Sequence, residues 1–116
     1  MLPALLTSLQ AIILTLVPGS EIESRVSGMR RDEPRVVDMD EAFYPGGAYV
    51  KSGRVALNGR WWAEDGRLCT RLVYAQSETW CRVIAKDEHG RLFAAGSVGD
   101  LNAGRVAEIR FVPIED

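Results

Sequence analysis

The stretch GRWWAEDGRLC, residues 59–69, decides the fold that this sequence predicts. Its Asp65-Gly66 pair is a strong signal for a tight hairpin turn, and the residues on either side of it are typical of strands. Adjacent residues in a strand face opposite sides of a sheet, so one of Trp61 and Trp62 is expected in the core. The other would lie on the outer face or in a groove, where it could bind a sugar or an apolar ligand.

Short strands separated by turn signals recur from Arg35 to the end of the chain. The turns and loops expected from Gly, Pro, Asn and Asp lie at Pro45–Gly47, Asn58-Gly59, Asp65-Gly66, Asp87–Gly90 and 98–104. A further turn is expected at 75–78, between two alternating segments, and a last strand over 105–114. Roughly seven or eight strands at this spacing predict a mainly β fold. We expect an antiparallel meander that forms a strongly bent sheet or small barrel, because closure protects strand edges.

The N-terminal segment differs from the rest of the chain. Residues 1–19 carry no charge, and the apolar run Ala11–Val17 has the length of a secretory hydrophobic region but is too short to span a membrane. No Lys or Arg precedes this run, which departs from a standard signal peptide. The sequence predicts a signal peptide or membrane-anchoring segment over 1–19 and a single β-rich domain over 20–116. An ordinary buried or membrane-lying helix is the alternative for the first segment.

A short helix is expected directly after this segment. Ser20 and Glu23 form a capping-box pattern, and Ile22 and Val26 share one helix face. Gly28 is a suitable stop signal. The helix is therefore predicted over 21–27, a charged connector follows at 29–34, and 36–40 is either a first strand or irregular chain.

The two cysteines flank the expected 75–78 turn. If Cys69 pairs with Cys81, the centre of the hairpin falls at Ala75 and both side chains point to one face, close enough for a disulfide. Two buried thiols are the main alternative. A disulfide together with the signal-like segment predicts an oxidising compartment, either the periplasm or the medium.

The charges exclude some classes of function. The net charge of −2 and the pI of about 5.4 argue against a nucleic-acid partner. The chain has twelve Arg and two Lys, and five of the arginines follow a glycine. These Gly-Arg pairs predict either repeated anion contacts or turns followed by exposed strand residues. One histidine and two cysteines are too few for a typical metal site, and no cofactor is expected.

Aromatic side chains are the candidates for ligand binding, and core packing is the alternative for each of them. The candidates are Trp61, Trp62, Trp80 and Tyr49. They predict a non-enzymatic binding or envelope-associated domain whose partner is an unidentified ligand or envelope component. The membrane would be contacted only through residues 1–19, if that segment is not cleaved.

Two other functions fit the sequence. Asp38, Asp40 or Glu41 could act with Arg60 or Arg71 in a small hydrolase or isomerase, which would need a concave site and a raised carboxylate pKa. Solvated surface carboxylates are the alternative. A protein inhibitor or partner subunit could instead act through loop 98–104, in which Gly99, Asn102 and Gly104 predict mobility.

Several motifs occur in an order typical of one group of proteins. They are GSEIESRVSG (19–28), an aromatic-Pro-Gly-Gly hairpin from Phe43 to Tyr49, GRW (59–61), DGRLC (65–69) and WC (80–81). The sequence resembles small exported bacterial proteins classed only as a domain of unknown function. The resemblance covers roughly residues 19–86 and implies a secreted β-rich domain with a disulfide between Cys69 and Cys81. It implies no activity and no catalytic residue.

Overall fold

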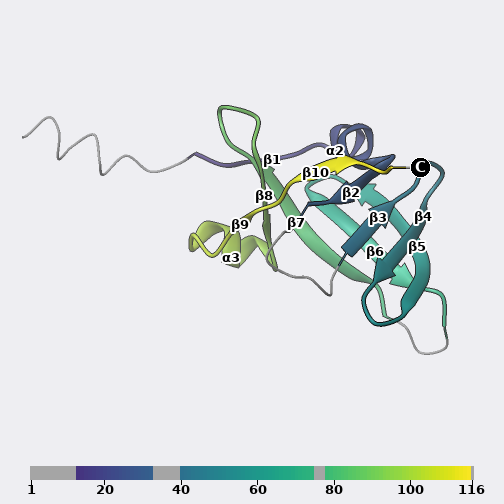
Figure 1. The fold of residues 1–116 in the computed structure, drawn as a ribbon. Helices are drawn as coiled ribbons and strands as arrows, with labels where there is room; N and C mark the ends of the chain where they lie inside the picture. Colours follow the sequence, from purple (N-terminus) through teal and green to yellow (C-terminus); the bar gives the residue numbers. More distant parts are fainter. Residues whose placement is uncertain (1–12, 33–39, 75–77, 116) are drawn as a thin grey trace, which may run out of the picture.

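A computed structural model describes residues 13–32, 40–74 and 78–115 and shows an antiparallel sheet curled into a half-barrel (Figure 1). The predicted mainly β fold with a strongly bent sheet is confirmed. The elements are β1 (Thr15–Leu16), α2 (Gly19–Val26), β2 (Met29–Arg31), β3 (Asp40–Phe43), β4 (Ala48–Ser52), β5 (Ala56–Glu64), β6 (Arg67–Leu72), β7 (Trp80–Lys86), β8 (Leu92–Ala95), α3 (Val98–Asn102), β9 (Ala107–Glu108) and β10 (Phe111–Pro113). The strand order is β10-β2-β3-β4-β5-β6-β7-β8-β9, and β1 pairs with β7 beside this path.

Successive residues of a strand point to opposite sides of the sheet. In the curled sheet, one set of side chains therefore faces the interior and the other set faces outward. Phe43 lies on the inner face and is completely buried. Its ring centroid is 5.3 Å from that of Tyr49 and 5.8 Å from those of Trp61 and Phe111. The same core cluster also contains Val17, Ile22, Val26, Leu68, Ile84, Leu92 and Ile109. Helix α2 contributes two of these residues and so packs its apolar side against the sheet.

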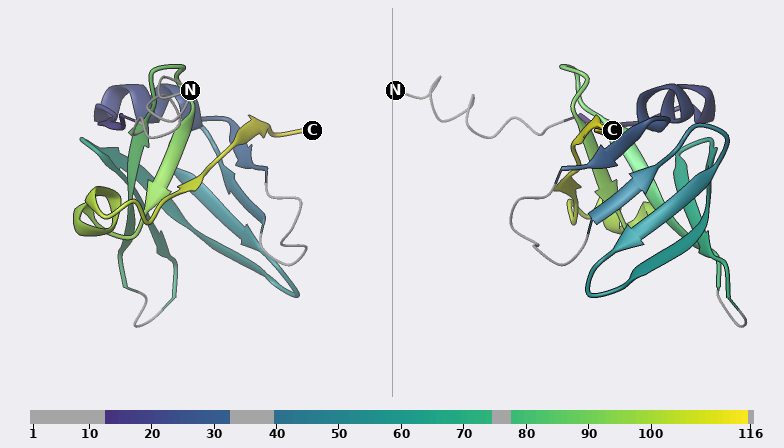
Figure 2. Two further views of the ribbon diagram at one scale, coloured as in Figure 1. Left: turned by 90° about the vertical axis from the view of Figure 1, so that its left-hand side faces the viewer. Right: turned by 45° about the vertical axis from the view of Figure 1, so that its right-hand side comes forward.

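The last segment of the chain joins the two edges of the sheet. β9 pairs with β8, and β10 pairs with β2 at the other end of the strand order. Between them, the Ile109 N–H donates to the Leu92 carbonyl at 3.0 Å, and the Arg110 carbonyl accepts from the Asp32 N–H at 2.8 Å. Figure 2 (left) shows this yellow segment crossing from one side of the sheet to the other. The predicted single strand over 105–114 is therefore two short strands, because the backbone changes partner between them.

Three of the predicted turns are confirmed, at Pro45–Gly47, Asp65-Gly66 and Asp87–Gly90. The first connects β3 to β4, the second β5 to β6, and the third β7 to β8. Gly46, Gly66 and Gly90 adopt φ values of 88°, 74° and 80°, which favour glycine. Residues 75–77 of the expected 75–78 turn lie outside the described residues.

The predicted turn at Asn58-Gly59 is wrong. Both residues lie inside β5, where Asn58 pairs with Val50, and the chain turns earlier, at Gly53–Val55. A Cβ added at Gly59 would clash with the carbonyl oxygen of Arg71 on β6. Glycine is needed here because two backbones approach closely, not because the chain reverses.

The predicted helix near the N-terminus is present, but its predicted cap is wrong. Helix α2 begins at Gly19 with Pro18 as N-cap, and no side chain caps it from within the helix, so Ser20 does not form a capping box. Instead, the Gly19 N–H donates to Asp65 Oδ1 at 2.8 Å, which ties the helix to the β5–β6 turn. The predicted stop is confirmed, since Gly28 follows the helix with a φ of 80°.

Two segments predicted as irregular contain regular structure. Part of the connector at 29–34 forms β2, which pairs with both β3 and β10. Loop 98–104 contains helix α3, whose first turn is capped because Ser97 Oγ accepts from the Asp100 N–H at 3.0 Å. A helix of five residues is too short to show a helical period in the sequence.

The predicted disulfide is confirmed. Cys69 on β6 lies directly opposite Cys81 on β7, with their Cα atoms 4.0 Å apart, and the next pair is Thr70 with Trp80. This is the register that the hairpin centred at Ala75 predicts. A bridge that persists in this form agrees with an oxidising compartment. In the described part of the chain, no helix is both long and apolar enough to cross a bilayer.

The described end of the signal-like segment belongs to the folded domain. β1 pairs with Lys86 and Ala85 of β7, and Val17 is 1% exposed within the core cluster. The Val17 N–H donates to the Ile84 carbonyl at 3.1 Å, and its carbonyl accepts from the Gly66 N–H at 2.8 Å. Processing that leaves the core intact would therefore have to occur before Thr15 rather than after residue 19.

Replacement of Val17 by alanine should destabilise the domain. The substitution removes two buried methyl-sized groups, so we expect the free energy of unfolding to fall by about 2 kcal/mol. Ile13→Ala is the matched control, since Ile13 is 76% exposed and its replacement should change stability by less than about 0.5 kcal/mol. Urea unfolding of both variants measures the difference. Equal stabilities would place the domain boundary at residue 19 after all.

Candidate functional site

The four aromatic candidates surround two neighbouring hollows. Tyr49 and Trp80 line an inner hollow of about 220 Å³ at one end of the half-barrel. Trp61 and Trp62 line a larger groove of about 900 Å³ over β5 and β6, and both hollows share Leu72 and Tyr74. The structure thus brings the predicted residues together around the C-terminal end of β6, but on two faces of the sheet.

Trp61 and Trp62 face opposite sides of the sheet, as their adjacent positions require. Trp61 is buried in the core, and its indole N–H donates to the Tyr44 carbonyl at 2.8 Å. Trp62 lies opposite Cys69 on the outer face and is half-buried, and its indole N–H donates to Glu64 Oε2 at 3.0 Å. Of the pair, Trp62 is therefore the one that a ligand can reach.

A buried ion pair crosses the interior of the half-barrel. Glu41 on β3 accepts two hydrogen bonds from the Arg82 guanidinium on β7, at 2.9 and 2.6 Å. The same carboxylate accepts from the Tyr49 hydroxyl at 2.5 Å and from Arg31 at 3.3 Å. Glu41 is 3% and Arg82 4% exposed, so this network is held away from water.

The network sets the ionisation of its members. Burial on its own would raise the pKa of Glu41, but the hydrogen bonds and charge of Arg82, with the Tyr49 hydroxyl and Arg31, outweigh it and lower this pKa. Burial and the adjacent carboxylate raise the pKa of Tyr49 well above its usual range. Glu41 is therefore a carboxylate and Tyr49 a neutral hydroxyl at neutral pH.

Trp80 lies at the open end of the half-barrel, next to the buried ion pair. It lies on the face opposite to Cys81, as predicted, but it is 55% exposed rather than packed in the core. Trp80 is the first residue of β7, and the hollow that it lines also contains the polar residues Lys51, Thr70 and Glu78. The Arg82 guanidinium lies 4.5 Å from the centroid of its ring, which is the geometry of a cation–π contact.

The arrangement of the carboxylates does not provide the predicted acid–base site. Asp38 lies outside the described residues, and Asp40 is exposed. The pKa of Glu41 is lowered, whereas that hypothesis needs a raised one. Strand alternation places Glu41 on the inner face and both Arg60 and Arg71 on the outer face, so the proposed partners do not meet.

Two arginines lie side by side in the outer groove. Arg60 on β5 and Arg71 on β6 are directly opposite each other in the register, which places their Cβ atoms roughly 5 Å apart. Both are exposed, and neither makes an ion pair or a side-chain hydrogen bond with the described residues. Like charges in directly opposed positions destabilise a sheet, so the fold itself gains nothing from this pair.

The other residues of the outer groove add aromatic surface but no negative charge. Its described lining consists of Gly46, Gly47, Arg60, Trp61, Trp62, Arg71, Leu72, Val73, Tyr74 and Thr79. None of these is acidic. Glu64, which binds the Trp62 indole, lies beyond the lining and forms an ion pair with Arg67. The groove can therefore hold a ligand that has both a negative charge and a flat face.

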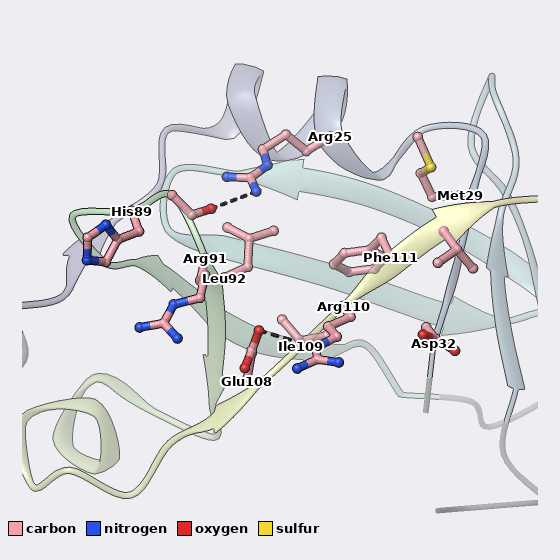
Figure 3. A pocket seen from close by; sticks show the side chains of 12 residues that line it. Arg25, Met29, Asp32, His89, Arg91, Leu92, Glu108, Ile109, Arg110 and Phe111 are labelled. Carbon is pink, nitrogen blue, oxygen red and sulfur yellow. Dashed lines mark hydrogen bonds and ion pairs between the residues drawn. The ribbon is translucent and has the colours of Figure 1, made fainter. Parts of the chain in front are cut away.

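A third hollow, of about 560 Å³, differs in having its arginines engaged (Figure 3). Arg25 donates to the Gly90 carbonyl at 2.8 Å, Arg91 binds Asp87 at 2.7 Å and Arg110 binds Glu108 at 3.3 Å. Figure 3 shows the first and the last of these contacts, one at Arg25 and the other between Glu108 and Arg110, with Leu92 between them. The contacts of the three arginines stabilise turns and edges of the fold, and they already balance the charge of these side chains.

Sequence reasoning missed part of this arrangement. It named Arg71 only as a possible catalytic partner, and Arg60 as a catalytic partner or as one of five Gly-Arg candidates for an anion contact. Their positions two residues from Trp62 and Cys69 place all four side chains on one face. That alternation was available from the sequence. The role of Arg82 was not, because its partner Glu41 lies 41 residues away.

Neither a metal site nor a known relative explains these residues. No group of three or more His, Cys, Asp or Glu side chains within the described ranges is placed to hold a metal ion. No protein-family model matches the sequence, and neither does any curated protein or solved structure. The resemblance to exported proteins of unknown function stays an expectation, and the function has to be argued from the geometry.

Replacement of Glu41 by glutamine should strongly destabilise the domain at neutral pH. It leaves Arg82 buried without a counter-charge, so we expect a loss of roughly 3 kcal/mol or more. The lowered pKa of Glu41 stabilises the fold above the ordinary glutamate pKa of about 4.3, and this contribution is lost as pH falls through the lower folded value. The variant should therefore lose less stability than the wild type in that acidic range.

Glu88→Gln is the control, because the Glu88 side chain is 82% exposed. It should stay within about 0.5 kcal/mol of the wild type at neutral pH. Denaturant unfolding of the three proteins at neutral and acidic pH provides the comparison. Equal stability of the two variants at neutral pH would show that the ion pair does not hold the interior together.

Proposed function

We propose that this chain is an exported, non-enzymatic domain that binds an envelope component in the outer groove over β5 and β6. The observation that carries the proposal is the pair of opposed arginines beside Trp62, which no carboxylate of the described residues balances. Some other arginines, such as the buried Arg82 and the exposed Arg91, are paired with a carboxylate. Side chains that the fold does not use and that line a concave surface are available to a ligand.

The disulfide supports an exported location. Cys69 and Cys81 are bonded, and Cys69 is completely buried between neighbouring strands. Such bridges persist in the periplasm or outside the cell and are rare in reducing compartments. A domain stabilised in this way suits a role at the cell envelope, where a ligand-binding surface has to persist without renewal.

A non-enzymatic role is favoured by the state of the inner carboxylate. Glu41 is held by three side chains and is ionised at neutral pH, so it offers no proton. Asp40 is exposed and lies on the opposite face of β3. The groove contributes cationic and aromatic groups, which recognise ligands but do not by themselves transfer protons.

Protein recovered from its producing cell should have no free thiol. Alkylation without reduction should leave the intact mass unchanged, and alkylation after reduction should add two groups, on Cys69 and Cys81. If a leader has been removed, the new N-terminus should lie before Thr15, because Val17 is part of the core. Intact-mass spectrometry tests both statements, and two reactive thiols before reduction would contradict export.

Tryptophan fluorescence should report ligand binding through Trp62. Polysaccharide, peptidoglycan and lipid fractions of the cell envelope are added separately to the wild type, Trp62→Phe and Trp80→Phe. We expect at least one fraction to shift the emission of the wild type and of Trp80→Phe but not that of Trp62→Phe, because Trp80 does not line the outer groove and Trp61, which does, is buried. If no fraction changes the wild-type emission, the proposed binding function is wrong.

A further inference from the structure

We infer that the ligand of the outer groove is an acidic saccharide chain whose carboxylates pair with Arg60 and Arg71 while a sugar ring packs against Trp62. The inference rests on the proposed binding function and specifies the ligand class. It follows from the two arginines and the tryptophan on the outer face of β5 and β6, from the absence of acidic groups in the described lining, and from the extent of the groove.

The two arginines of the groove favour an anionic ligand. Arg60 and Arg71 are opposed in the register, and a single carboxylate can bridge two guanidinium groups at this separation or each can take its own. An anion between them converts a repulsive pair into two charge-assisted hydrogen-bonded pairs. Guanidinium groups bind planar carboxylates in a bidentate manner, which favours uronic-acid carboxylates over a diffuse negative surface.

Trp62 favours a ligand that has a flat ring next to its negative charge. Trp62 is two residues from Arg60 on the same face of β5, a distance of about 7 Å along the strand. Its indole N–H is already bound by Glu64, which fixes the ring and leaves its apolar surface for packing. A sugar ring that packs against Trp62 and carries a carboxylate can therefore contact Trp62 and an arginine together.

A polymer fits the groove better than a compact ligand does. The lining runs from Gly46 and Gly47 across β5 and β6 to Val73 and Tyr74, so the groove crosses two strands and continues past the end of β6. Nucleic acid is disfavoured because the chain carries a net charge of −2 and the described lining of the groove includes two cations, Arg60 and Arg71. A saccharide with spaced carboxylates needs only a few charge contacts and uses the aromatic surface for the remainder.

The test uses the full, disulfide-bonded chain and a matched pair of probes. The probes are a tetramer of galacturonic acid and the same tetramer with its carboxyl groups methyl-esterified. Calorimetry gives the affinities, and two-dimensional NMR of the indole N–H groups shows whether Trp62 is at the binding site. We expect the acid to bind at least tenfold more tightly than the ester and to shift the Trp62 signal.

Three single variants separate the site from general charge attraction. Arg60→Gln and Arg71→Gln should each weaken binding of the acid at least tenfold, whereas Arg54→Gln, which makes the same change in net charge outside the groove, should not. The melting temperatures of the Arg60 and Arg71 variants should not fall below that of the wild type, because each removes a repulsive neighbour. A loss of binding with a lower melting temperature would indicate a structural role and overturn the inference.

The remaining outcomes are also decisive. If acid and ester bind equally with a shift at Trp62, the ligand is not recognised by its carboxylates and the inference fails, while the proposed binding function stands. If Arg54→Gln loses as much affinity as the groove variants, the attraction is nonspecific and the inference fails. If neither probe binds, the inference fails, and the envelope-fraction experiment decides the proposed function separately.

Discussion

The ion pair between Glu41 and Arg82 depends on closure of the sheet and in turn stabilises it. The two residues lie on β3 and β7, which are four steps apart in the strand order. In a flat sheet four spacings of about 4.8 Å would separate them by roughly 19 Å, yet the nitrogen and oxygen atoms are 2.6 Å apart. Only a tightly curled sheet allows this contact, and a buried pair in turn resists uncurling because separation would leave two unpaired charges in the interior.

Closure also decides what each face of the sheet can do. The inner face is filled by aromatic and aliphatic side chains at one end and by the Glu41 network at the other. The segment through Ile109 and Arg110 bonds to both edges and so fixes the curvature from outside the meander. The inner face keeps a smaller hollow beside Tyr49 and Trp80, and the groove over β5 and β6 offers more room for a ligand. The groove beside Trp62, of about 900 Å³, is larger than the three other hollows of about 560, 220 and 390 Å³.

Features that depend on neighbouring residues could be predicted from the sequence, and features that depend on distant contacts could not. The register that bonds Cys69 to Cys81 follows from the centre of one hairpin, and the turn at Asp65-Gly66 follows from two residues. Asn58-Gly59 carries an equally strong turn signal, but there the glycine accommodates the backbone of β6. The cap of α2 failed for a similar reason, because its acceptor is Asp65 and not Ser20.

The candidate site divides in the same way. Alternation along β5 predicted that one tryptophan of the pair would face outward, and the structure identifies it as Trp62. The exposure of Trp80 could not be predicted, because a strand pattern does not show where the core ends along each strand. The groove itself is assembled from the turn at Gly46-Gly47, from β5 and from the end of β6, so no single local pattern contains it.

The contrast between the inner and outer arginines bears most directly on function. Arg82 is satisfied by Glu41 and covered by Trp80, and although its Nε has no acceptor, that atom is inaccessible to solvent and thus to a ligand. Arg60 and Arg71 are accessible and repel each other, at a cost of up to about 1 kcal/mol. The adjacent disulfide closes a loop of 12 residues and contributes roughly 3 kcal/mol in the chain-entropy account, which exceeds that cost. Strand β6 carries both the disulfide to β7 and the arginine pair with β5. The domain can therefore keep an unfavourable pair of charges next to a hairpin that a covalent bond reinforces, and such a pair becomes favourable when an anion binds.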